Sequence, residues 1–291
     1  MWSLVRIELF KVFRKPRTYI AFAAVMAIVG LIQLGFYVDG KNYLSFGMQS
    51  LSESFDVEGK ILNGYLMGYI ILQTLLVHVP LLIALVAGDM ISGEANMGTL
   101  RLLVSRPRSR QGLLMGKFIA SCIYTVALLL WMAVWALGVS VLLFGADDML
   151  ILKSEVVTQV LRSDVLWRYV AAFGFATLSM ITVAALAFLL SVFAENSIGP
   201  IITCMSIVIV FTILNTLNLP FFNTIKPFLF TTHMLGWKGF FDLKVNAAHE
   251  QVVGSIEHPA AIARSAAMLV LHIILFYGTA VYFFRRKDIL S

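Results

Sequence analysis

The sequence has little charge and almost no cysteine, and both scarcities narrow the class of protein. Only 13% of its 291 residues are charged and 60% are hydrophobic, whereas soluble domains are about a quarter charged and about half apolar. The two cysteines, Cys122 and Cys204, lie in separate apolar runs, so they indicate neither a disulfide framework nor a metal-ligand pair. The composition predicts an integral membrane protein in which both cysteines are core residues.

Ionisable side chains are also scarce within the apolar runs, where only His78 and His272 lie well inside. A lone histidine at such a position is expected to be neutral and hydrogen-bonded to a neighbouring helix. The same helix–helix bonding is expected of Gln73, Ser179, Thr182 and Asn215. We expect no catalytic residue, because no metal-binding pair, serine nucleophile motif or paired carboxylates occur at membrane depth. For the same reason the sequence does not favour a proton-coupled or sodium-coupled carrier.

Six apolar segments are each long enough to cross a bilayer as a helix, which takes about 20 residues. They cover residues 18–38, 64–88, 118–144, 169–193, 198–217 and 264–284. Each exceeds the length of a strand, and the alternating pattern of an outer-membrane barrel is missing. The predicted fold is therefore an all-α integral membrane protein, one transmembrane domain over residues 1–291.

Basic residues concentrate in three stretches outside these runs, namely residues 1–17, the connector 89–117 and the segment after residue 284. They are Arg6, Lys11, Arg14, Lys15, Arg17, Arg101, Arg106, Arg108, Arg110, Lys117, Arg285, Arg286 and Lys287. The connectors 39–63 and 145–168 are balanced or acidic instead. Because lysine and arginine favour cytoplasmic loops, we expect both termini in the cytoplasm and the chain in the cell (cytoplasmic or inner) membrane. This bias accounts for the net charge of +6 without nucleic acid.

Residues 1–17 predict an amphipathic helix that lies at the inner headgroups. Its apolar face is expected to hold Trp2, Val5, Leu9, Val12 and Phe13, with Lys11, Arg14 and Lys15 opposite. Pro16 should separate this helix from the first span. Apolar side chains on the polar side favour a protein contact in addition to membrane lipid; they are Leu4, Ile7 and Phe10.

The connector 89–117 contains a charged, helix-like stretch from Ser92 to Arg110. Ser92 is expected to cap a helix of about three turns that ends before Pro107. On this helix one mixed face would hold Glu94, Met97, Arg101 and Val104. A glycine inside a helix costs about 1 kcal/mol relative to alanine, so we expect Gly98 to admit the close approach of another backbone. The alternative is a loop whose arginines only set topology or contact lipid phosphates.

The stretch GEANMGTLRLLVSRPRSRQGLLMGK resembles the cytoplasmic signature of the permeases of the type-two exporter family of ABC transporters. The residues that carry the resemblance are Glu94, Gly98, Thr99, Leu102, Leu103, Pro107, Arg110 and Lys117. In that family the segment is the coupling helix, which docks in a groove of a separate ATP-binding subunit. The resemblance implies that Glu94 meets a basic group of that partner. It implies a partner contact at Glu94, Met97, Gly98, Thr99, Arg101, Val104, Arg106, Pro107 and Arg110, and on the N-terminal helix at Trp2, Arg6, Leu9, Lys11, Phe13 and Arg14.

The chain has no phosphate-binding loop of its own. At Gly116-Lys117 the motif fails, because Gln111 stands where its first glycine belongs and Phe118 follows the lysine. We therefore expect no enzyme activity and no cofactor in this chain, with ATP and Mg held by the partner. The resemblance also implies a second permease subunit, identical or paralogous, that meets the chain near its second and fifth spans.

The longest predicted outer connector, residues 218–263, is rich in aromatic residues. Such residues suit the membrane–water boundary, and the resemblance implies short helices that enter the outer leaflet; the alternative is a lid without a role in transport. For the whole chain the competing interpretation is a six-span scaffold or assembly factor outside the ABC class, with a basic connector that only sets topology.

Overall fold

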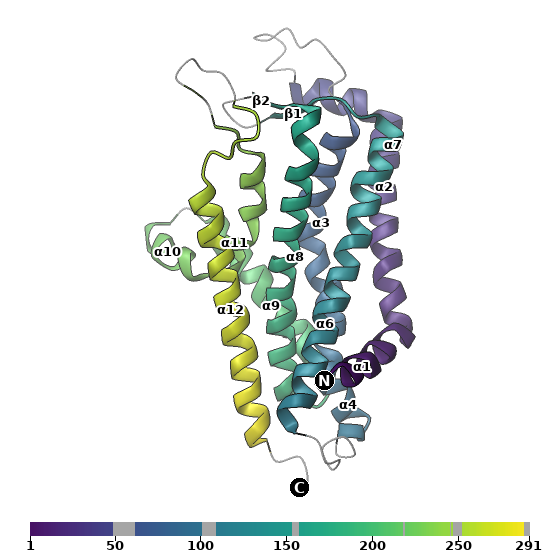
Figure 1. Cartoon of the computed structure of the whole chain (residues 1–291), viewed down its shortest axis with the longest axis vertical. Coiled ribbons are helices and arrows are strands. Elements are labelled where there is room, and N and C mark those ends of the chain that lie inside the picture. The colour runs from purple at the N-terminus through teal and green to yellow at the C-terminus, as the bar shows by residue number, and fades with distance from the viewer. Residues whose placement is uncertain are drawn as a thin grey trace.

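The computed structural model describes residues 1–48, 62–100, 109–152, 157–217, 219–244, 246 and 252–287. Within these residues six helices are long and apolar enough to cross a membrane. They include α2 (Pro16–Met48), α3 (Gly64–Ala87), α6 (Arg110–Ala133), α8 (Arg162–Phe193), α9 (Ile198–Thr216) and α12 (Pro259–Arg286). The helices run side by side as one elongated bundle (Figure 1). The prediction of a helical, multi-pass membrane protein is confirmed.

Several of these helices extend beyond the predicted apolar runs. The first span continues to Met48 and the sixth to Arg286, while α6 begins at Arg110 and α8 at Arg162. The apolar run marks the hydrocarbon crossing, whereas backbone hydrogen bonding carries a helix on through polar residues. The helices are therefore longer than the predicted apolar runs at these ends.

The third span is not a uniform α-helix. Between α6 and α7 (Ser140–Phe144) it contains the π-helical turn η1 (Val134–Val139). A π-turn interrupts the regular hydrogen-bond ladder and often marks a functional position. The buried amide of Gln33 on α2 reaches this turn, and its Nε2 atom donates to the Trp135 carbonyl and to Ser140 Oγ, each at 2.9 Å. Hydropathy alone does not reveal this polar contact between the first and third spans.

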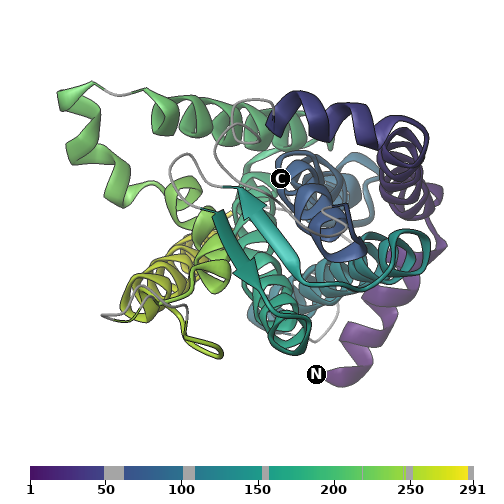
Figure 2. The same ribbon diagram turned by 90° about the horizontal axis from the view of Figure 1, so that it is seen from above.

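A short β-hairpin, which the sequence did not predict, is added to the helical fold. Strands β1 (Met149–Leu152) and β2 (Val157–Val160) pair antiparallel, with Met149 opposite Val160 and Ile151 opposite Thr158. Apolar and β-branched residues favour this local pairing. The hairpin lies across one end of the bundle (Figures 1 and 2), and the short helices α1 (Trp2–Arg14) and α4 (Asp89–Asn96) lie at the other end.

After α9 the chain forms a series of short helices, as predicted. They are α10 (Pro220–Ile225), η2 (Lys226–Phe228), α11 (Phe230–Met234) and η3 (Leu235–Phe241). Figure 1 places α10 and α11 partway along α12 instead of beyond its end. Asn215 joins them to α9, because it donates to Thr231 and accepts from Thr232. The depth of these short helices in the membrane stays a prediction.

The polar side chains within the spans have different partners. Ser179 contacts Phe175 of its own helix and the Met234 carbonyl, and His272 contacts Met268 of its own helix and the Phe228 carbonyl. Together with Asn215, these residues confirm the predicted contacts between segments. The same prediction is wrong for His78 and Thr182, which bond to the carbonyls of Thr74 and Leu178 on their own helices. Gln73 is exposed on α3.

Candidate docking site at one end of the bundle

The helices α1 and α4 cap one end of the bundle, near the first turns of α2 and α6 (Figure 1). Pro16 begins α2, and Lys15 before it is extended, with φ −83° and ψ 132°. This agrees with the restriction that a proline places on the preceding residue. The predicted break between an N-terminal helix and the first span is therefore confirmed. Gly116 on α6 lets α1 pack closely, because a Cβ atom there would lie 3.2 Å from Leu4 Cβ.

Four charged side chains join α1, α4 and α6 at this end, and we call them the four-charge network. Lys117 on α6 lies 2.8 Å from Glu8 and 2.7 Å from Glu94. Lys11 lies 2.9 Å from each of the same two carboxylates. Two carboxylates and two ammonium groups therefore balance one another, and each joins helices that are distant in sequence.

Three members of the four-charge network are excluded from water. The side chains of Lys117, Glu8 and Glu94 are 2%, 5% and 8% exposed, whereas that of Lys11 is 38% exposed. Glu94 Oε2 has no hydrogen-bond partner among the described residues. A buried ion pair gives little net stability relative to an apolar pair, but removal of one partner costs about 3–5 kcal/mol. The network therefore specifies where α4 sits against α1 and α6.

The charged states of Glu8 and Lys11 on α1 follow from their neighbours in the four-charge network. Burial on its own raises the pKa of Glu8, but the ammonium groups of Lys117 and Lys11 hold that pKa below its usual value. Burial lowers the pKa of Lys11, and its bonds to Glu8 and Glu94 more than compensate, so this pKa is raised. Both groups are charged near neutral pH, as the ion pairs require.

A second set of polar contacts fixes the start of α4. Asp89 lies 2.7 Å from Lys15 and 2.8 Å from Arg17, and it accepts a hydrogen bond from Ser197 between α8 and α9. Ser191 Oγ of α8 accepts from the backbone N–H groups of Ile91 and Ser92 at 3.1 and 2.9 Å. These contacts therefore hold α4 against the junction of α1 and α2, against α8, and against the residue before α9.

The helix in this connector differs from the predicted one. It begins at Asp89, and Ser92 lies inside it and donates to the Gly88 carbonyl, so Ser92 is not its cap. It ends at Asn96, and Gly98 lies beyond the end with φ +68°, where no atom of the described residues lies within 4 Å of a Cβ position. Gly98 therefore supplies a left-handed residue that ends the helix, and the close approach of another protein's backbone there stays a prediction.

The predicted docking face is not continuous. Glu94 points into the four-charge network and pairs within the chain, and its expected pairing with a basic group of another protein stays a prediction. Met97 is 60% exposed, and Thr99 donates to the Glu94 carbonyl. Arg101, Val104, Arg106 and Pro107 lie outside the described residues.

Arg110 contacts α12 within the same chain. Its Nη1 atom donates to the backbone carbonyls of Arg285 and Lys287 at 3.3 and 3.0 Å. A basic side chain at a helix C-terminus satisfies carbonyls that lack an intrahelical partner. Arg110 therefore joins the first turn of α6 to the last turn of α12.

The faces of α1 are partly as predicted. Val5 and Val12 are buried and Leu9 and Phe13 partly buried, but Trp2 is 70% exposed and does not belong to the buried face. Glu8 takes its place against the bundle, because Lys117 neutralises it there. Ile7 and Phe10 are exposed, as are Arg6 and Arg14. This side of α1 thus offers apolar and basic groups to a lipid surface or a protein.

A second buried charge site lies toward the hairpin end and was missed by the sequence analysis, which assigned its residues to a connector. On α8, Arg168 lies 2.6 Å from Asp164 and is fully buried. Arg168 also donates to the carbonyls of Phe240 and Ser255, and Asp164 accepts from Gly254 N–H. The i, i+4 spacing of an acid and a base was the available signal.

The described residues contain no group of three or more His, Cys, Asp or Glu residues that could hold a metal ion. Over residues 24–290 the sequence matches the family described as "Protein of unknown function (DUF2705)", and the chain belongs to that family. A search of curated proteins gives no match.

Proposed function

We propose that this chain is the permease subunit of an ATP-driven ABC exporter and that a separate ATP-binding subunit docks at the end formed by α1 and α4. One observation carries the proposal. The exporter-like motif begins within α4 at Glu94, and α4 is held by buried ion pairs to α1 and α6 and follows α3 directly at Gly88. A contact on α4 would therefore act on several helices at once.

The route of such an action follows the contacts. Gly88 joins α3 directly to α4, Glu94 joins α4 to Lys117 of α6, and Asp89 joins it to Lys15 and Arg17. Because packed interiors transmit strain, displacement of α4 by a nucleotide-driven partner would displace the inner ends of the first three spans. ATP and Mg are held by that partner in this proposal.

The exposed side of the same end supplies a surface for the partner. Met97 is 60% exposed just beyond α4, and Trp2, Ile7 and Phe10 are exposed on α1. Large exposed apolar side chains next to basic ones suit a protein contact or the lipid boundary. We assign this end to the cytoplasm of the cell membrane, on the basis of its arginines and lysines.

The proposed transporter contains a second permease subunit, identical or paralogous. On α3 the exposed residues are Gln73, Val77, His78 and Leu81, and on α9 they include Ile202, Ile209 and Ile213. These two spans are the ones that the family resemblance places nearest the axis between subunits. Their exposed faces would meet the second subunit, and the remaining exposed apolar faces would meet lipid.

A site-specific photo-crosslinker tests the central contact. The tagged full-length chain carries the probe at Met97 in one variant and at Leu142, which is 85% exposed on α7 near the hairpin end, in the matched control. We expect an ATP-binding protein to be captured in native membranes from Met97 and not from Leu142. Purified alone, the chain should not hydrolyse ATP. Absence of an ATP-binding protein from both adducts and from the co-purified material would instead favour the scaffold interpretation.

A further inference from the structure

We propose that the inner end of α12 holds an anionic phospholipid, with its phosphate at Arg285 and Arg286 and an acyl chain along Gly278 and Val281. A pocket of about 510 Å³ lies here, lined by Gly278, Val281, Tyr282, Arg285 and Arg286. Its volume is in the range of about 300–1,000 Å³ that is usual for small-molecule sites. This inference does not depend on the proposed transport function.

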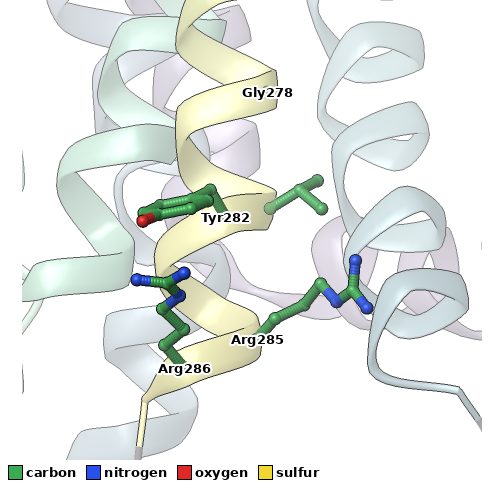
Figure 3. A pocket seen from close by; sticks show the side chains of 5 residues that line it. Gly278, Tyr282, Arg285 and Arg286 are labelled. Atoms are coloured by element: carbon green, nitrogen blue, oxygen red, sulfur yellow. The ribbon is translucent and has the colours of Figure 1, made fainter.

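The polar part of the pocket is positively charged. Figure 3 shows Tyr282 and Arg286 projecting on one side of α12 and Arg285 on the other, toward a neighbouring helix. The Arg286 guanidinium stacks over the Tyr282 ring, 4.2 Å from its centre. Among the described residues, neither arginine forms an ion pair with a carboxylate. Guanidinium groups match phosphate oxygens in geometry and charge, so an anionic headgroup fits this part of the pocket.

Neighbouring basic side chains increase the positive charge without occupying the pocket. Arg110 reaches the backbone carbonyls of Arg285 and Lys287, and Lys287 Nζ donates to the Val192 carbonyl at 2.8 Å. These contacts satisfy carbonyls at helix ends, which explains Arg110 and Lys287 structurally. They do not account for Arg285 and Arg286, whose side chains line an open volume.

The apolar part of the pocket is open because Gly278 has no side chain. Gly278 lies inside α12, seven residues before Arg285, which is about 10 Å along the helix axis. Among the described residues, no atom lies within 4 Å of the position that a Cβ atom at Gly278 would take, so the glycine leaves open space there. A helix-interior glycine is unfavourable by itself. The space lies on the hydrocarbon side of the arginines, where an acyl chain continues from its headgroup.

Lipid binding to the purified full-length chain tests the proposal. Native mass spectrometry in detergent measures the affinity for phosphatidylglycerol and for phosphatidylcholine with the same acyl chains. We expect phosphatidylglycerol to bind about tenfold more tightly, and the Arg285→Gln/Arg286→Gln variant to lose about tenfold in its affinity. Gly278→Leu should weaken the binding of phosphatidylglycerol to a similar degree, because the leucine side chain would fill the acyl groove. The open space at this position accommodates the leucine side chain, so the variant should still fold.

Two matched variants test whether lipid binding depends on this pocket. They control for the general positive charge at this end and for the replacement of a helix glycine. Gly35→Leu replaces another helix glycine with open space, on α2, and Arg6→Gln removes an exposed cation at the same end of the bundle. Both should bind phosphatidylglycerol as the parent does. Affinities of Gly278→Leu and the double arginine variant within twofold of the parent, or an equal loss in Arg6→Gln, would overturn the proposal. Displacement of the lipid by millimolar glycerol phosphate would overturn it in favour of a soluble phosphate ester.

Discussion

Glu94 and Lys117 form an ion pair of 2.7 Å between α4 and α6, and both side chains are almost wholly buried. They stand 23 positions apart in the sequence, near the two ends of the exporter-like motif. The pair makes the position of α4 depend on a charge at the start of the third span. It also makes Glu94 an internal residue of the four-charge network.

Removal of either charge is predicted to destabilise the protein. Glu94→Leu and Lys117→Leu each remove one charge from the four-charge network and leave its remaining charges unbalanced, for an expected loss of about 3–5 kcal/mol. Thermal unfolding of the purified protein in detergent measures this. The control is Met97→Leu, which changes an exposed side chain one residue beyond α4 and should unfold like the parent. A melting temperature of Glu94→Leu equal to that of the parent would contradict the assigned pairing.

The docking of α1 is predicted to depend on pH at both extremes. The pKa of Glu8 is lowered in the folded state, so its contribution is complete above about pH 4.5 and is lost as pH falls through the lower folded value. The pKa of Lys11 is raised, so its contribution is complete below about pH 10.5 and is lost as pH rises through the higher folded value. Melting temperature against pH should therefore show a plateau between these limits. Glu8→Gln should reduce the acid-side fall, and an unchanged fall would assign it to other groups.

Gly98 is predicted to tolerate asparagine better than valine. Its φ of +68° is a left-handed conformation, which costs other L-residues about 1–2 kcal/mol; asparagine adopts this conformation more readily and β-branched residues least. Because no atom lies near the Cβ position, packing should not obscure the comparison. Thermal unfolding should rank the parent above Gly98→Asn and Gly98→Asn above Gly98→Val. Equal stability of the two variants would mean that the helix can end without this conformation.

Arg168 is predicted to hold the segment after η3 against α8. Arg168→Met removes its bonds to the carbonyls of Phe240 and Ser255 and leaves Asp164 buried without its base, so an expected loss of about 3–5 kcal/mol follows. A cysteine at Leu243, which is buried, reports the segment locally. This cysteine should react slowly with a thiol reagent when Arg168 is present and quickly in the Arg168→Met variant. Slow reaction in both would show that other contacts suffice.

The spans could be predicted from the sequence because hydrocarbon crossing requires a long apolar run, and each run stands out from its polar flanks. The boundary between α1 and α2 could be predicted for a similarly local reason. Pro16 has no backbone N–H group to donate, so a helix does not continue through it. The hairpin was missed, since four-residue strands carry little signal. The π-turn at Val134–Val139 was missed too, because the contact that Gln33 makes there lies between spans that are distant in sequence.

The contacts within the candidate site could not be predicted from the sequence, and the binding of a partner there stays a prediction. Glu94, Lys117 and Glu8 are recognisable only as charges in sequence, and their pairing needs three helices to be in position. Gly98 was assigned to a helix interior because the helix was expected to end only before Pro107, whereas α4 ends at Asn96 and the glycine follows it. Among the predicted contact residues, Trp2 and Met97 are 70% and 60% exposed, and a partner contact at them is still a prediction.

The last prediction concerns the orientation of the bundle, which the charge asymmetry predicts and the fold makes testable. Met97 is exposed at the end that holds α1 and α4, and Asp147 is exposed beside the hairpin at the other end. In a background with Cys122 and Cys204 replaced by alanine, a cysteine at Asp147 should react with a membrane-impermeant thiol reagent in intact cells. A cysteine at Met97 should react only after permeabilisation, because lysine and arginine at its end favour the cytoplasm. Permeabilised cells, in which both positions should react, control for accessibility. Labelling of Met97 alone in intact cells would reverse the orientation and move the proposed docking end away from cytoplasmic ATP.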